Sequence, residues 1–183
     1  MKRMAPYYGG ALGLLYVVYG VLQVINGITK WWLGRSDSLQ LGIRVTDIVI
    51  PNAFPDPFSG VTLITVGLLF VASLYHYRRG KGVYRGYLLA AWFLAITLLL
   101  LNIVEIAANV LDSYYPLILG LEPEEPWSLA NDAWGLAPHM LLGLLALPLY
   151  LGLKDMIKEL APGVPSEKGK RTERTTSFLY NSS

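Results

Sequence analysis

The stretch RGYLLAAWFLAITLLLLNIVE, residues 85–105, decides the fold, because no charged residue lies between Arg85 and Glu105. A membrane-spanning helix needs about 20 apolar residues, since a helix rises about 1.5 Å per residue and the hydrocarbon core is about 30 Å thick. Strands of a membrane barrel would alternate polar and apolar residues. The run Leu98-Leu99-Leu100-Leu101 does not alternate. We therefore predict a transmembrane helix over residues 86–111.

Three more runs of this length carry no charge. They lie between Arg3 and Lys30, between Asp56 and Arg78, and between Asp132 and Lys154. They predict helices over residues 8–28, 58–77 and 134–153. The first run is longer than the apolar region of a signal peptide and no cleavage site follows it, so we expect it to be retained. Only 15% of the residues are charged, against about 25% in soluble domains. The fold class expected is an all-α, polytopic membrane protein with a four-transmembrane-helix bundle.

Lysine and arginine predict the orientation, because loops on the cytoplasmic side carry an excess of both. Of the 15 lysines and arginines, only Lys30, Arg35 and Arg44 fall on the side of the loops 30–57 and 112–133. The other side holds both termini and the basic link between the second and third helices. We therefore expect a multi-pass protein of the cell membrane with both termini in the cytoplasm, and we call the loop side the outer side.

The domain organisation follows from the same pattern. Residues 1–160 form the predicted transmembrane domain, and residues 161–183 form a polar cytoplasmic tail whose composition is typical of disorder. In the first outer loop, residues 39–50 mix aliphatic side chains with Arg44 and Asp47, which predicts a short interfacial helix. The prolines of residues 51–57 exclude a regular helix there.

A stripe of glycines marks one face of the first helix. These residues are Gly9, Gly13, Gly20 and Gly27. Their spacings of four, seven and seven residues place them on one face. Small residues allow close approach of helices in lipid. We therefore predict a helix-packing role for this stripe.

Polar residues gather at the predicted outer ends of the helices. This outer polar layer comprises Gln23, Asn26, Asn102, Glu105, Asn109, Asp132 and His139. An acid within a membrane span is a candidate functional residue, so Glu105 and His139 are candidates for an acid–base pair. The alternative is a hydrated end of the bundle held together by polar contacts. We assign no catalytic residue and expect a role other than enzymatic.

Several classes of site are excluded. The chain has no cysteine, so thiolate metal sites and iron–sulfur clusters are impossible. The two histidines, His76 and His139, fall on opposite predicted sides of the membrane, which excludes bis-histidine haem ligation and a tight metal site. We expect no cofactor, although a quinone or a bound lipid would suit such a protein.

The partners expected are the lipid bilayer and other membrane subunits or further copies of this chain. The net charge of +2 gives no reason to expect a nucleic acid. The basic link between the second and third helices is expected to contact anionic headgroups. Its basic residues are Arg78, Arg79, Lys81 and Arg85.

The first half of the chain resembles the DoxX/DoxD-like family of small four-helix membrane proteins. The stretches concerned are GLLYVVYG at residues 13–20 and GLLF at residues 67–70, which leads to the basic turn. Some members of that family are associated with quinone-linked respiratory or sulfur-oxidising systems. The resemblance implies no catalytic residue in this chain.

Three functions remain open from the sequence. The first is a non-catalytic integral membrane subunit of a larger assembly, respiratory or quinone-linked if the resemblance holds. The second is a small oligomeric transporter or channel that uses the outer polar layer. The third is a lipid- or quinone-modifying membrane enzyme that uses Glu105 and His139, which requires the two side chains to converge.

Overall fold

The fold is described from a computed structural model. It describes residues 4–35, 39–45, 48–120, 127–129, 132 and 136–154. Contacts divide the chain after Leu153, and the features below belong to the part up to that residue. The predicted polar tail and the sequence 133–135 at the predicted start of the fourth helix lie outside the described residues.

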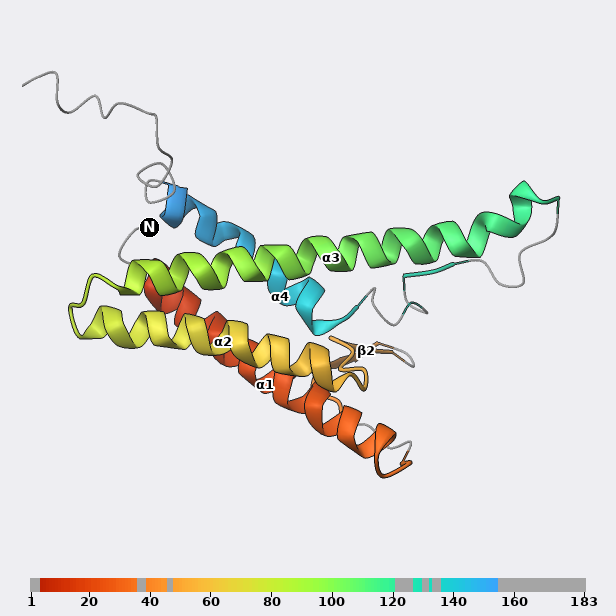
Figure 1. The fold of residues 1–183 in the computed structure, drawn as a ribbon, viewed down its shortest axis with the longest axis horizontal. Helices are drawn as coiled ribbons and strands as arrows, with labels where there is room; N and C mark the ends of the chain where they lie inside the picture. The colour runs from red at the N-terminus through yellow and green to blue at the C-terminus, as the bar shows by residue number, and fades with distance from the viewer. Residues whose placement is uncertain are drawn as a thin grey trace, which may run out of the picture. The chain divides into compact units, whose positions relative to one another are not determined.

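Three helices are long and apolar enough to cross a membrane. They are α1 (Ala5–Trp31), α2 (Pro57–Arg78) and α3 (Tyr84–Ile118). All three confirm the predicted membrane helices, but α3 continues to Ile118 instead of ending near residue 111. Asn109 and Asp112 therefore do not stop the helix, which ends only where Gly120 takes a positive φ of 72°. Figure 1 shows α3 continuing well past the end of α2.

The fourth predicted span is shorter and broken. The helix α4 (Pro138–Ala146) is followed by a 3-10 turn, η1 (Leu147–Leu149), and the apolar helical segment ends at Lys154. Pro148 explains the break, because proline has no N–H to donate to the carbonyl one turn back and its ring clashes with that turn. The described segment is thus a short apolar helix and does not reach the length of the other three.

The first outer loop also differs from the prediction. In place of an interfacial helix, β1 (Ile43–Val45) pairs antiparallel with β2 (Ile48–Ile50). Ile43 is paired with Ile50, and Val45 with Ile48. Both strands are rich in β-branched residues, which favour extended backbone over helix. This local preference outweighs the amphipathic pattern on which the helix prediction depended.

The glycine stripe packs mainly against α2, and at Gly9 also against Leu88 of α3. A Cβ built on Gly13 would lie 2.8 Å from the Gly67 carbonyl oxygen, and one built on Gly20 would lie 2.7 Å from the Gly60 carbonyl oxygen. The relation is reciprocal, because a Cβ on Gly60 would lie 2.7 Å from the Gly20 oxygen. Gly27 contacts Pro57 at the start of α2 in the same way. Backbones this close allow Cα–H···O contacts that side chains would prevent.

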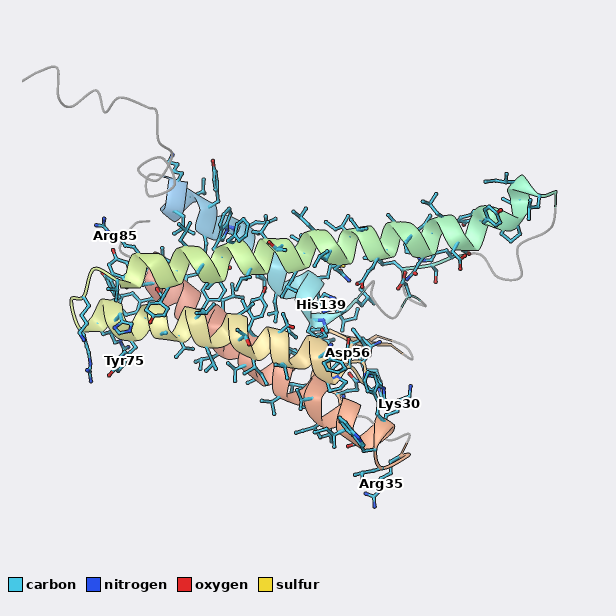
Figure 2. All side chains as sticks on the ribbon, in the orientation of Figure 1. Lys30, Arg35, Asp56, Tyr75, Arg85 and His139 are labelled. Atoms are coloured by element: carbon cyan, nitrogen blue, oxygen red, sulfur yellow. The ribbon has the colours of Figure 1, made fainter. Side chains whose placement is uncertain are left out.

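Aromatic and basic side chains cover the end of the bundle where α2 turns into α3, which we call the basic end. The Arg79 guanidinium lies 4.3 Å from the centre of the Tyr75 ring. The Tyr77 ring contacts both Tyr7 and Tyr84 edge-on, with ring centres 5.6 and 5.0 Å apart. The Ser73 hydroxyl donates to the Tyr84 carbonyl at 3.0 Å, which joins α2 to α3. Figure 2 shows Tyr75 and Arg85 at this end and Asp56 and His139 toward the other end of α2.

Candidate functional site

The outer polar layer lies at the end of the bundle opposite the basic end, where Asp56 at the start of α2 is a further acid (Figure 2). The Asp56 carboxylate caps α2 by accepting from the N–H groups of Phe58 at 3.0 Å and Ser59 at 3.1 Å. It is also close enough to act electrostatically on both Glu105 and His139. From the sequence, Asp56 was identified only as the charged edge of a predicted span. An aspartate before a proline and an apolar run is an N-cap signal that would have identified it.

Asn26 organises the first outer loop. Its side chain is only 2% exposed. The amide donates to the carbonyls of Leu39 at 2.8 Å and Ala53 at 2.7 Å, and its oxygen accepts from the Leu39 N–H at 2.7 Å. Gln40 completes the arrangement by accepting from the Ala53 N–H at 3.0 Å. Both amide hydrogens and the oxygen of Asn26 are therefore bonded to backbone groups of the loop. This residue has a structural role.

Two polar side chains of α1 are buried more deeply. Gln23 and Tyr16 are both 0% exposed. The Gln23 oxygen accepts from the Ser59 hydroxyl at 3.4 Å. The Gln23 amide nitrogen and the Tyr16 hydroxyl have no hydrogen-bond partner among the described residues. Buried groups of this kind bind water or a ligand where they persist in native proteins.

Asn102 and Glu105 lie together on α3. Asn102 is buried, and its side chain donates a hydrogen bond to the Glu105 carboxylate. Glu105 itself is exposed. Its neighbours Leu101 and Val104 are exposed too, Val104 by 65%. The structure therefore brings this predicted pair together and places a carboxylate on an otherwise apolar surface of α3.

Asn109 and Asp132 form a second pair, between α3 and the second outer loop. The Asn109 amide donates to both Asp132 carboxylate oxygens at 3.1 Å, and the Trp127 indole donates to one of them at 2.8 Å. The two outer loops also meet, because the Asn52 N–H donates to the Leu136 carbonyl at 2.8 Å. The second outer loop is thus bonded to α3 and to the first outer loop.

His139 lies near the start of α4, 5% exposed. Its ring contacts the Phe54 ring edge-on, with centres 6.0 Å apart. Asp56 is the acid that acts on both His139 and Glu105, so the two candidate acid–base residues share a neighbour. Among the residues described, no group of three histidine, aspartate or glutamate side chains could hold a metal ion.

The four basic residues predicted to contact headgroups are all exposed at the basic end. His76 lies beside them, with its ring stacked on Tyr87 at 5.1 Å between centres. Tyr75, Tyr77 and Tyr84 share this end with the arginines. An exposed arginine and tyrosine layer is the arrangement that suits a membrane–water interface.

Membrane-length helices, glycine-mediated packing and aromatic ends define the class: this is an integral membrane protein. The chain belongs to the family described as MJ0565 integral membrane domain, which it matches over residues 1–155. That family is a membrane protein family, but the match gives no support to the DoxX/DoxD-like family in particular. No curated protein and no solved structure matches the chain.

Proposed function

We propose that the protein is a non-catalytic integral membrane subunit of a larger membrane assembly. The observation that carries the proposal is the exposed face of α3, where the Glu105 carboxylate lies beside Leu101 and Val104. A carboxylate on a lipid-facing surface is costly unless a polar partner or water satisfies it. Asn102 supplies one donor to the Glu105 carboxylate. A neighbouring subunit that offers a further donor at this level would complete its hydrogen bonding and cover the aliphatic side chains around it.

The length of α3 supports the same proposal. This helix runs from Tyr84 to Ile118, whereas about 20 residues suffice to span. Its distal part exposes Leu111, Tyr115 and Ile118 and extends past α2 (Figure 1). Exposed apolar side chains beyond the membrane favour a covering protein.

The test is extraction of the full chain from its native membrane in a gentle detergent, followed by native electrophoresis and mass spectrometry of bound proteins. We expect stoichiometric larger subunits with the wild-type chain and their loss with Glu105→Lys. Thr62→Lys is the control, because Thr62 is exposed on α2, outside the proposed surface, and its hydroxyl donates only to Phe58 in the same helix. Wild-type protein that migrates alone would overturn the proposal. The identity of the subunits would show whether the assembly is respiratory or quinone-linked.

A small oligomeric transporter or channel is the second candidate. The Tyr16 hydroxyl and the Gln23 amide nitrogen favour it, because both are buried polar groups without a hydrogen-bond partner in the described part of the chain. In this case, proteoliposomes of the wild-type chain show ion or solute flux that the double variant Tyr16→Phe, Gln23→Leu loses. Absence of flux across a panel of ions and small solutes with the wild-type chain would remove this candidate.

We also propose that the basic end faces the cytoplasm. The support is the asymmetry of lysine and arginine together with the arginine and tyrosine layer at that end. Because the chain has no cysteine, single cysteines report accessibility without a background signal. A membrane-impermeant maleimide should label Leu33→Cys in intact cells and Lys81→Cys only after permeabilisation. The opposite labelling pattern would reverse the orientation.

A further inference from the structure

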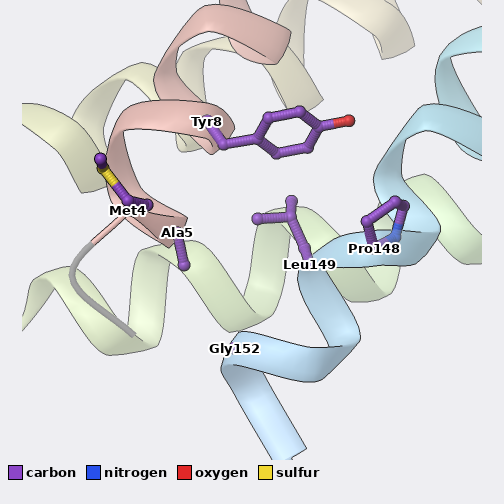
Figure 3. A pocket seen from close by; sticks show the side chains of 6 residues that line it. All are labelled: Met4, Ala5, Tyr8, Pro148, Leu149 and Gly152. Atoms are coloured by element: carbon purple, nitrogen blue, oxygen red, sulfur yellow. The ribbon is translucent and has the colours of Figure 1, made fainter. Parts of the chain in front are cut away.

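An apolar cavity lies between the start of α1 and the segment around η1. Its volume is about 270 Å³. Among the residues that the structure describes, six line it: Met4, Ala5, Tyr8, Pro148, Leu149 and Gly152. Figure 3 shows the Tyr8 ring facing Leu149, with Ala5 of α1 and the preceding Met4 on one side and Pro148 on the other. The only polar side-chain group in this lining is the Tyr8 hydroxyl.

The break at Pro148 creates this cavity. The Leu147 N–H donates to the Leu144 carbonyl, which closes a 3-10 turn. The Tyr8 hydroxyl donates to the carbonyl of Leu145 at 2.6 Å, so a side chain of α1 satisfies backbone at the break. Beyond the turn the chain returns to α1, since a Cβ on Gly152 would lie 2.9 Å from the Ala5 Cβ. Gly152 thus lies against Ala5 on one side of the cavity. The Tyr8 hydroxyl is already hydrogen-bonded to the Leu145 carbonyl.

We propose that this cavity holds one hydrocarbon chain of an anionic phospholipid. Every lining residue belongs to the part of the chain that matches an integral membrane domain, residues 1–155. Apolar side chains continue outside the cavity, where Tyr150 and Leu151 are half exposed. The volume lies below the roughly 300–1,000 Å³ of pockets for drug-sized ligands. It suits a narrow, flexible chain with no hydrogen-bonding groups.

Positively charged residues next to the lining segments favour an anionic headgroup. Lys2 and Arg3 directly precede Met4 in the sequence, and Lys154 follows Gly152 by two residues. In the sequence, both lining segments are therefore directly followed or preceded by cations. Basic residues beside a membrane span attract anionic lipids. The inference is independent of the proposed assembly, because it concerns α1 and η1, whereas the assembly concerns α3.

The test is photo-crosslinking from inside the cavity. The full chain is produced with photo-methionine in place of methionine, irradiated in its membrane, digested and mapped by mass spectrometry. We expect the Met4 peptide to carry the mass of an anionic phospholipid. Met140, in α4 and outside the lining, is the internal reference and should carry little. This comparison needs no variant, so it stands even if a substitution impairs folding.

A pair of variants then tests the cavity itself. Ala5→Leu places a larger side chain in the lining and should remove most of the lipid label from Met4. Ala11→Leu makes the same change at an exposed position of α1 and should leave the label unchanged. Equal labelling in the two variants would overturn the proposal. So would a Met4 adduct to a second copy, to residues 155–183 of the same chain or to a quinone, or no adduct above that of Met140.

Discussion

Gly20→Val is expected to separate α1 from α2 and to cause a large loss of stability. The new Cβ would lie 2.7 Å from the Gly60 carbonyl oxygen and 2.8 Å from the Ile64 backbone nitrogen. Backbone atoms cannot rotate away as a flexible side chain can, so the helices must move apart. Overpacking typically costs about 1–3 kcal/mol, and we expect about 3 kcal/mol or more here, because the contact is with backbone.

The measurement is the free energy of unfolding in bicelles, followed by tryptophan fluorescence during denaturation. Gly86→Val is the matched control, because a Cβ on Gly86 of α3 would meet no atom within 4 Å. Gly60→Val should reproduce the effect from the α2 side, where the Gly20 oxygen is 2.7 Å away. If Gly20→Val and Gly86→Val lower stability equally, the close contact of α1 and α2 is wrong.

Asn26→Leu is expected to release the first outer loop from the bundle. The substitution removes two donors and one acceptor that bind Leu39 and Ala53. The Ala53 carbonyl keeps the Gln40 amide as a donor, so the N–H and carbonyl of Leu39 are the groups left without a partner. Each such group costs about 1–3 kcal/mol, so the expected total is about 2–6 kcal/mol. The leucine side chain replaces the volume of asparagine, which separates the loss of hydrogen bonds from the formation of a cavity.

Limited proteolysis reports this effect directly, because cleavage within residues 30–57 depends on local opening of the loop. We expect Asn26→Leu to be cleaved much faster than the wild type. Thr29→Val is the control, since the Thr29 hydroxyl donates only to Ile25 one turn earlier in the same helix. Unchanged cleavage of Asn26→Leu would mean that the loop is held by other contacts.

The membrane helices could be predicted because charge is expensive in the hydrocarbon core. The uncharged runs therefore gave α1, α2 and most of α3. The end of α3 and the break in α4 were missed for opposite reasons. Polar residues such as Asn109 do not stop a helix once it leaves the membrane. Pro148 is visible in the sequence, but membrane helices often tolerate proline, so its presence alone does not predict a 3-10 turn.

The candidate site was predictable as a set of residues but not as a set of contacts. Gln23, Asn26 and Glu105 were identified by depth along their helices. The partners of Asn26 are backbone groups in a loop whose conformation depends on β1 and β2, which the sequence analysis expected to be helical. Gly60 and Gly67 repeat the seven-residue spacing of Gly13 and Gly20. This match between two helices was the missed signal for their pairing.

The reciprocal glycine contacts have a consequence for biosynthesis. Gly13 faces Gly67 and Gly20 faces Gly60, so the interface contains only residues made before the basic link between α2 and α3. Two antiparallel helices with a complete contact surface form a helical hairpin that needs no later part of the chain. Such a hairpin can leave the insertion machinery as one unit while α3 is still being synthesised. The remaining helices then assemble against a template that is already folded.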